Sequence, residues 1–225
     1  MSNSLQEAVR LYQSKRWDVA LKALLEVELD GHDQLEAIEL AYYLGLCYTK
    51  LSRYDDAMLY LEQVITSDVD PLKLYQCRMA LAFVYALTDR NRLAEFELKK
   101  LLDAGYESVQ LWSSLAYTAW KQKRAETAVS CYEKALGMDG ENPNALNGLG
   151  FVLCDAEIDV PKGMTLCRRA VDARPKNPAY LDSLGWALYK GGNVADARIW
   201  LRRALDIAPR EEEILAHLKT VMGES

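Results

Sequence analysis

Few residues in this 225-residue chain have the types and spacing that catalysis or metal binding requires. The two histidines, His32 and His217, are far apart in the sequence, and we expect both to be exposed to solvent. No zinc-protease, nucleophile-elbow, phosphate-loop or dinucleotide-binding pattern occurs. Gly191-Gly192 follows no strand pattern, so we interpret it as a turn rather than a phosphate cradle. We therefore expect a protein that is not an enzyme, with no catalytic residue, no metal and no cofactor.

The five cysteines are the remaining candidates for metal or redox chemistry. Their odd number and the lack of a Cys-x-x-Cys pair favour a reducing compartment, so we expect a cytoplasmic protein. A free cysteine in a helix commonly behaves as a small buried hydrophobe. Cys154 is the one that we expect to lie toward an open surface and to react first with a thiol reagent. The cysteines are Cys47, Cys77, Cys131, Cys154 and Cys167.

The charge of the chain argues against nucleic acid as a partner. The formal net charge is -6, and the isoelectric point is about 5.1, whereas binding to phosphates normally needs a basic surface. The acidic residues concentrate at 1–70, which hold 6 Lys/Arg and 13 Asp/Glu, a balance of -7. This concentration fits either a solvated outer face or a surface that attracts a basic partner.

The sequence shows neither an export signal nor a membrane span. The first four residues are polar and run directly into a helical pattern, with no basic segment or cleavage site. No uncharged apolar stretch approaches 18 residues, the length that a membrane-spanning helix requires. A signal removed before the first residue remains an alternative to the cytoplasmic assignment.

The elements that position these residues follow from a pattern repeated six times. Each copy has a first helix with apolar residues at i, i+3 or i+4 and i+7, and a second helix that begins with a small residue. Because a lone hairpin cannot bury the apolar face of either helix, neighbouring hairpins must stack. The small residues stand 37, 37, 34, 35 and 34 positions apart, at Ala20, Ala57, Ala94, Ala128, Gly163 and Ala197.

This pattern resembles the tetratricopeptide repeat, whose 34-residue unit has a Trp-x2-Leu-Gly-x2-Tyr…Ala-x3-Phe…Pro signature. The clearest copy runs from Leu184-Gly185 through Ala197 to Pro209, and another begins at Trp112. The resemblance implies an all-α fold, a right-handed superhelical solenoid of six antiparallel helix hairpins plus a C-terminal capping helix. As one array, its repeats cover approximately 1–34, 38–71, 75–108, 109–142, 143–177 and 178–211, and the capping helix covers 211–222.

In proteins with this repeat, the first helices line a concave groove. One position of the groove set reads Val9, Leu46, Phe83, Tyr117, Phe151 and Trp186 along the array. Exposed apolar patches usually mark interaction sites, and Tyr and Trp are enriched at binding hot spots. Alternatively, tight curvature lets these side chains pack on each other. The predicted partner-binding residues are Met79, Phe83, Gln110, Ser113, Tyr117, Trp120, Asn144, Asn147, Phe151, Asp182, Trp186 and Tyr189.

Two binding modes of the family lack their residues in this chain. Chaperone-binding members clamp a C-terminal carboxylate with Lys, Asn and Arg, but the corresponding places are Tyr42, Leu46, Met79, Phe83, Ser113 and Ser114. Glycosyltransferase-linked members carry an Asn ladder, but those positions are Tyr43, Ala80, Ser114, Gly148 and Ser183. The resemblance therefore implies a different ligand mode.

We expect a scaffold or adaptor that binds a peptide or amphipathic helix of a partner protein in an aromatic-lined groove. The alternative is a structural subunit whose apolar groove or first repeat mediates self-association into a homo-oligomer. Five arginines of the second helices fit either solvation or, as an alternative, an acidic-partner patch. They are Arg168, Arg169, Arg198, Arg202 and Arg203.

Overall fold

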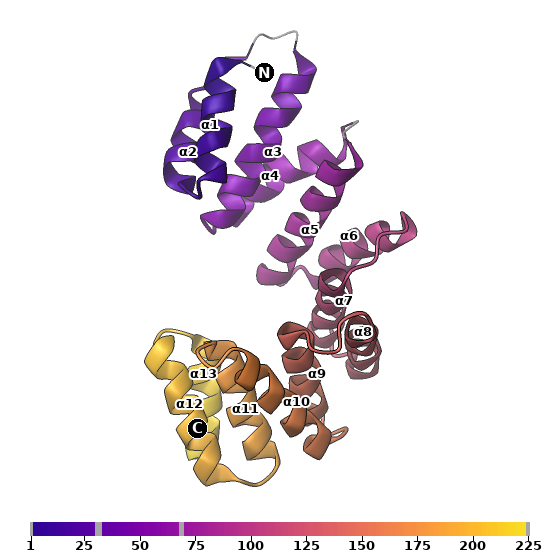
Figure 1. The fold of residues 1–225 in the computed structure, drawn as a ribbon, viewed down its shortest axis with the longest axis vertical. Coiled ribbons are helices and arrows are strands. Elements are labelled where there is room, and N and C mark those ends of the chain that lie inside the picture. The colour runs from indigo at the N-terminus through magenta and orange to yellow at the C-terminus, as the bar shows by residue number, and fades with distance from the viewer. Residues whose placement is uncertain (1, 30–32, 68–69, 224–225) are drawn as a thin grey trace. The chain divides into compact units, whose positions relative to one another are not determined.

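In the computed structural model, which describes residues 2–29, 33–67 and 70–223, the chain forms helices and no strand (Figure 1). Six antiparallel hairpins and a final helix account for all thirteen helices of this described part, as the repeat pattern predicts. The hairpins are α1 (Asn3–Gln13) with α2 (Trp17–Leu25), α3 (Gln34–Lys50) with α4 (Tyr54–Ile65), α5 (Pro71–Leu87) with α6 (Asn91–Asp103), α7 (Val109–Lys121) with α8 (Ala125–Met138), α9 (Pro143–Asp155) with α10 (Val160–Ala173), and α11 (Pro178–Lys190) with α12 (Val194–Ile207); α13 spans Glu212–Met222.

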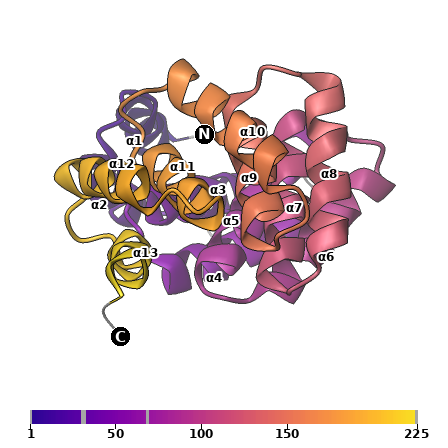
Figure 2. The ribbon, with the colours of Figure 1, turned by 90° about the horizontal axis from the view of Figure 1, so that it is seen from below.

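The hairpins group into two compact units of three hairpins each. Unit 1 comprises residues 1–106 and holds α1 to α6, and unit 2 comprises residues 107–225 and holds α7 to α13. Within unit 2, each first helix contacts the next first helix along the chain, so that α9 lies against α7 and α11 lies against α9 (Figure 2). Helix α13 packs against α11 and α12 and buries Ile214 and Val221 there.

All six first helices begin at a residue whose side chain caps the free backbone N–H groups of the first turn. These caps are Ser2, Asp33, Asp70, Ser108, Asn142 and Asn177. Proline occupies the first helical position of α5, α9 and α11, where its missing N–H costs nothing. The second helices α2, α4, α6 and α8 instead begin after an arginine that makes no capping hydrogen bond.

Every hairpin turns through a residue with a left-handed backbone. In the fourth hairpin, Lys123 has a φ of 62°, and the next N–H, that of Arg124, donates back to the carbonyl of Ala119 at 2.9 Å. This six-to-one bond satisfies a carbonyl at the helix end in the Schellman arrangement. The same bond recurs in all six hairpins, and the left-handed residues are Lys15, Ser52, Asp89, Lys123, Glu157 and Gly192.

Small residues let the two helices of a hairpin approach closely. A Cβ on Gly150 of α9 would lie 2.8 Å from the carbonyl oxygen of Gly163 on α10, so these two backbones nearly touch. A Cβ on Gly185 of α11 would lie 3.2 Å from the carbonyl oxygen of Ala197 and 2.7 Å from Cγ of Leu201, both on α12. The small residues therefore act as the repeat pattern requires.

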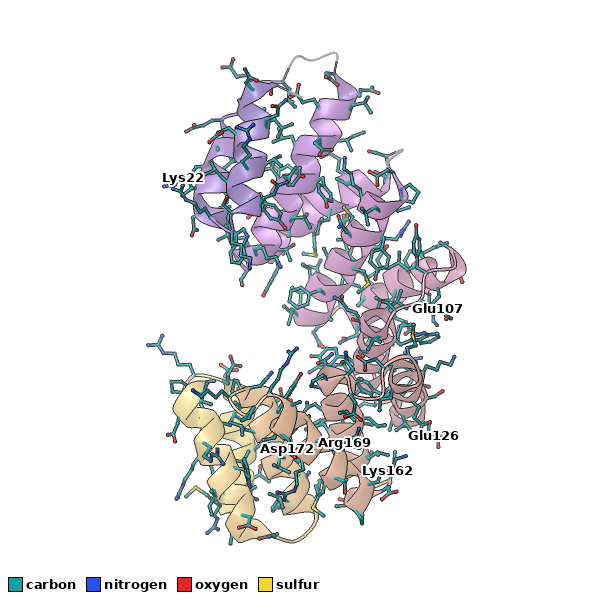
Figure 3. The ribbon with its side chains drawn as sticks, viewed as in Figure 1. Lys22, Glu107, Glu126, Lys162, Arg169 and Asp172 are labelled. Atoms are coloured by element: carbon teal, nitrogen blue, oxygen red, sulfur yellow. The ribbon has the colours of Figure 1, made fainter. Side chains whose placement is uncertain are left out.

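Two of the second helices end just before a proline, and the last two second helices carry exposed arginines. Helices α10 and α12 end two residues before Pro175 and Pro209 respectively. The five arginines singled out in the sequence are all exposed. Figure 3 labels Arg169 and Asp172 on α10, and Arg169 donates to Glu141, in the connection before α9, at 2.6 Å.

Candidate functional site

The twelve predicted groove residues divide between the units. Met79 and Phe83 lie on α5 of unit 1, where Met79 is half-buried and Phe83 is exposed. The other ten lie on α7, α9 and α11 of unit 2, and we call this set the first-helix face of unit 2. Contrary to the prediction, Ser113 and Asp182 are buried beneath it. Its ten residues are Gln110, Ser113, Tyr117, Trp120, Asn144, Asn147, Phe151, Asp182, Trp186 and Tyr189.

The first-helix face of unit 2 carries a continuous row of ring contacts. Trp120 of α7 meets Phe151 of α9 edge to face, with ring centroids 6.0 Å apart. Trp186 and Tyr189 of α11 lie 5.2 Å apart, centroid to centroid. His217 of α13 joins the two pairs, since its ring is 6.1 Å from that of Phe151 and 4.2 Å from that of Trp186. The side chains of this row therefore pack partly on each other.

His217 is not exposed, and this corrects the sequence prediction. Only 13% of its side chain is accessible, and its Nδ1 lies 2.9 Å from Oδ1 and 3.0 Å from Oδ2 of Asp182. Its ring stacks on Trp186 at an interplanar angle of 19°. The repeat pattern predicts α13 only as a capping helix, and the contacts of His217 arise from the way α13 packs against α11. The prediction for His32 falls outside the described residues.

Hydrogen bonds and ion pairs fix the Trp186 end of the face. The indole N–H of Trp186 donates to Oδ1 of Asp155, at the end of α9, at 2.8 Å. Lys190 pairs with Glu157 at 2.7 Å, and its ammonium lies 5.7 Å from the centroid of the Trp186 ring. These contacts hold α11 against α9 and orient the indole in one position.

Two polar residues of the face join α11 to the helices beside it, α9 and α13. Asn147 of α9 donates from its side-chain nitrogen to the hydroxyl of Ser183 on α11 at 3.1 Å, and Asp182 accepts from His217. Ser113, at the same place on α7, has a buried hydroxyl without a hydrogen-bond partner in the described part of the chain, as has Oδ1 of Asn147. We call a polar side-chain pairing between successive first helices, such as that of Asn147 with Ser183, a rung.

Unit 1 has rungs of its own. Tyr42 of α3 donates to the side chain of Gln76 on α5, and Lys73 pairs with Glu39 between the same two helices. Burial raises the pKa of Tyr42 beyond its ordinary range, so its hydroxyl stays a donor. Three tyrosine rings cluster beside these rungs. The ring of Tyr43 lies 4.9 Å from that of Tyr42 and 5.5 Å from that of Tyr12, centroid to centroid.

The α7 end of the face in unit 2 is the more open end. Tyr117 is 39% exposed, and Trp120 is half-buried. Lys121 lies 6.0 Å from the centroid of the Tyr117 ring, and Lys123 lies 6.0 Å from that of Trp120. Neither lysine forms an ion pair with any residue that the structure describes. An exposed ring beside an unpaired cation is a feature that the sequence pattern did not indicate.

The cysteines are mostly inert. Cys154 is completely buried, contrary to the prediction that it faces an open surface, because α9 and α10 approach so closely at Gly150 and Gly163. Burial raises the pKa of the Cys154 thiol to about 12. Only Cys131 is partly accessible. Within the described ranges, no three His, Cys, Asp or Glu side chains gather as a metal site would need.

Comparison with protein families decides what the chain is. One tetratricopeptide repeat model matches residues 5–69 and 165–212, and another matches 109–142. This chain belongs to the tetratricopeptide repeat family. Tetratricopeptide repeat (TPR) proteins bind protein partners and are generally non-catalytic scaffolds. None of the helices described here is both long enough and apolar enough to cross a membrane.

Two curated relatives share the repeats of this TPR chain. A TPR repeat-containing protein of Pseudomonas aeruginosa is 29% identical over 171 residues, which are 75% of this chain and 28% of the relative. Protein O-mannosyl-transferase TMTC1 of Homo sapiens is 23% identical over 175 residues, 76% of this chain and 19% of the relative. The chain thus spans about a quarter or less of the length of these relatives.

Solved structures share the TPR fold. The Cut9–Hcn1 hetero-tetramer of the APC/C contains a chain that superposes with a TM-score of 0.75 at 11% identity, over 97% of this chain and 42% of that one. YrrB, described as a TPR protein with an unusual peptide-binding site, superposes with a TM-score of 0.55 at 17% identity, over 80% of this chain and 91% of YrrB. At these identities the likeness concerns the fold alone.

Proposed function

We propose that this TPR protein is an adaptor that binds a segment of a partner protein on the first-helix face of unit 2. The observation that carries the proposal is the open α7 end, where Tyr117 is 39% exposed beside Trp120. Aromatic rings that are held in place and partly accessible supply large contact area at little cost in conformational entropy. The peptide-binding site in the description of YrrB supports a ligand of this kind on a related fold.

The charges around this end indicate the chemistry of the segment. Lys121 and Lys123 lie over the rings of Tyr117 and Trp120 and have no carboxylate partner among the described residues. An apolar side chain packed on the rings would bring its neighbours within reach of these ammonium groups. The segment that fits best therefore carries an aromatic or aliphatic anchor beside Asp or Glu, and its affinity falls as salt screens the charges.

A selection from displayed random peptides tests this function with the whole chain as bait. Replacing Tyr117 by Ala should weaken the binding of the selected peptides by more than about 1 kcal/mol, because the proposal makes this ring a central contact. Phe96→Ala is the control, since Phe96 is an even more exposed ring (53%) that lies on the second helix α6. Equal binding by both variants, or no enrichment at all, would overturn the proposal.

The same variants separate this function from self-association. Light scattering over a concentration series measures the mass of the particle in solution. A mass that rises with concentration in the native protein and not in Tyr117→Ala would assign the face to a second copy of the chain. A constant mass together with peptide binding favours the adaptor.

A further inference from the structure

His217 lies where a partner of the first-helix face would reach Trp186. It stacks on the indole at a centroid distance of 4.2 Å and bonds to Asp182, and both of those residues belong to the face. We propose that His217 is a proton-controlled cover of Trp186, closed when the imidazole is charged and released more readily when it is neutral. The proposal rests on the proposed function, because it describes how one end of that binding face becomes accessible.

The groups around His217 favour the charged ring. Three carboxylates from three helices face it: Asp182 on α11, Asp155 on α9 and Glu213 on α13 itself. The cation that α12 directs toward α13, Arg198, instead donates to the carbonyl of Val221 at 3.3 Å, one turn beyond His217. A charged imidazole stacked on an indole also gains a cation–π attraction.

The balance of these effects sets the direction of the switch. Burial disfavours the charged ring, but the hydrogen bond that His217 donates to Asp182 and the nearby carboxylates outweigh it, so the pKa of His217 lies above its ordinary value of 6.5. Because the pKa of His217 is higher when α13 is docked, protonation of the imidazole stabilises docking. This stabilisation is complete at pH values below the pKa of the free histidine, and it is lost as pH rises through the pKa of the docked histidine. The cover is therefore closed in acid and loosens toward alkaline pH.

Helix α13 is suited to move because few of its side chains are buried. Among its 11 residues only Ile214 and Val221 are buried, and no side chain caps its first turn. Short elements with few buried apolar contacts open at low free-energy cost. The contact of His217 with Trp186 and Asp182 adds to a small set that also includes Ile214, Val221 and the partly buried Leu218, so its loss should favour opening of α13.

Fluorine NMR of the full chain labelled with fluorotryptophan tests the cover directly. The five tryptophans give separate resonances, and Trp186→Phe identifies the one at issue. This resonance should shift and become more accessible to solvent as pH rises through a midpoint above 6.5. In His217→Gln the shift should vanish, and in His217→Arg, which is cationic at every pH used, the resonance should stay protected.

His32→Gln is the matched control, because His32 is the other of the two histidines of the chain. The Trp186 titration should persist in this variant. A Trp186 resonance that does not move with pH, or that moves equally in His217→Gln, would overturn the cover. The fluorine resonance of Trp186 is measured without a partner, so the two proposals can fail separately. If the protein binds no peptide but the resonance titrates, only the proposed function is contradicted. If the protein binds peptide but the resonance does not change with pH, only the cover is contradicted.

Discussion

Gly148 shows how strongly a single residue is constrained where two hairpins stack. A Cβ added to Gly148 of α9 would lie 2.2 Å from Cζ of Tyr132, a buried ring on α8. Tyr132 cannot move away easily, since its ring is packed in the core of unit 2. We expect Gly148→Ala to lower the free energy of unfolding by about 2 kcal/mol or more, measured by urea denaturation.

Gly137→Ala provides the control for this substitution. Gly137 lies in α8, and nothing stands within 4 Å of its Cβ position. Alanine there should raise the free energy of unfolding by about 0.5–1 kcal/mol, because glycine in a helix loses more backbone freedom on folding. A Gly148→Ala variant as stable as Gly137→Ala would contradict the close packing of Tyr132.

For single residues, sequence spacing was enough to place aromatic side chains on the first helices, but not to show which residues are buried or which contact α13. The helical period put Trp120, Phe151, Trp186 and Tyr189 on first helices, and the structure joins them in one row. It could not reveal His217, because the partner of this residue stands 35 positions away on another helix. It also placed Asp182 and Ser113 toward a groove, whereas helix stacking buries both.

Among the elements, the six hairpin turns share one backbone but not one residue type. Gly192 takes the left-handed conformation, φ 83°, without steric cost, whereas Ser52 takes it with φ 57° at some cost. Gly192→Ala should therefore destabilise the protein by about 1 kcal/mol, and Ser52→Gly should stabilise it by up to about the same amount. Thermal unfolding of the two variants beside the native chain measures both effects, and shifts of the same sign would contradict the assignment.

These turns also show why the helices were predictable and their junctions less so. Apolar periodicity and the small residues at 34 to 37 positions fix the number and order of the helices, and Pro175 and Pro209 fix two of their ends. Five of the six left-handed residues are not glycine. The hydrogen bonds of the Schellman turn impose that conformation, so the residue types alone do not reveal it.

For the whole molecule, the division at residues 106 and 107 predicts where the chain can be cut. The buried apolar cluster of unit 2 draws on residues from Ala116 to Val221 and on none before 107. A fragment of residues 107–225 should therefore unfold cooperatively, with the helical circular dichroism expected of seven helices.

A shorter fragment, residues 143–225, serves as the control for the 107–225 fragment. It lacks α7 and α8 and so loses the cover that Tyr132 gives at Gly148 of α9. It should be markedly less stable than the 107–225 fragment in the same denaturant series. If the longer fragment is unfolded, or if both are equally stable, the boundary does not lie between α6 and α7.

The rungs between successive first helices limit how the hairpins of this protein can be exchanged or reordered. Each rung is divided between neighbouring repeats: Asn147 needs Ser183, and Tyr42 needs Gln76. A hairpin copied elsewhere in an array carries only half of the rung at each of its edges. Moving hairpins within the array therefore preserves these polar contacts only when two neighbouring hairpins are moved together, so the smallest exchangeable unit is larger than one repeat.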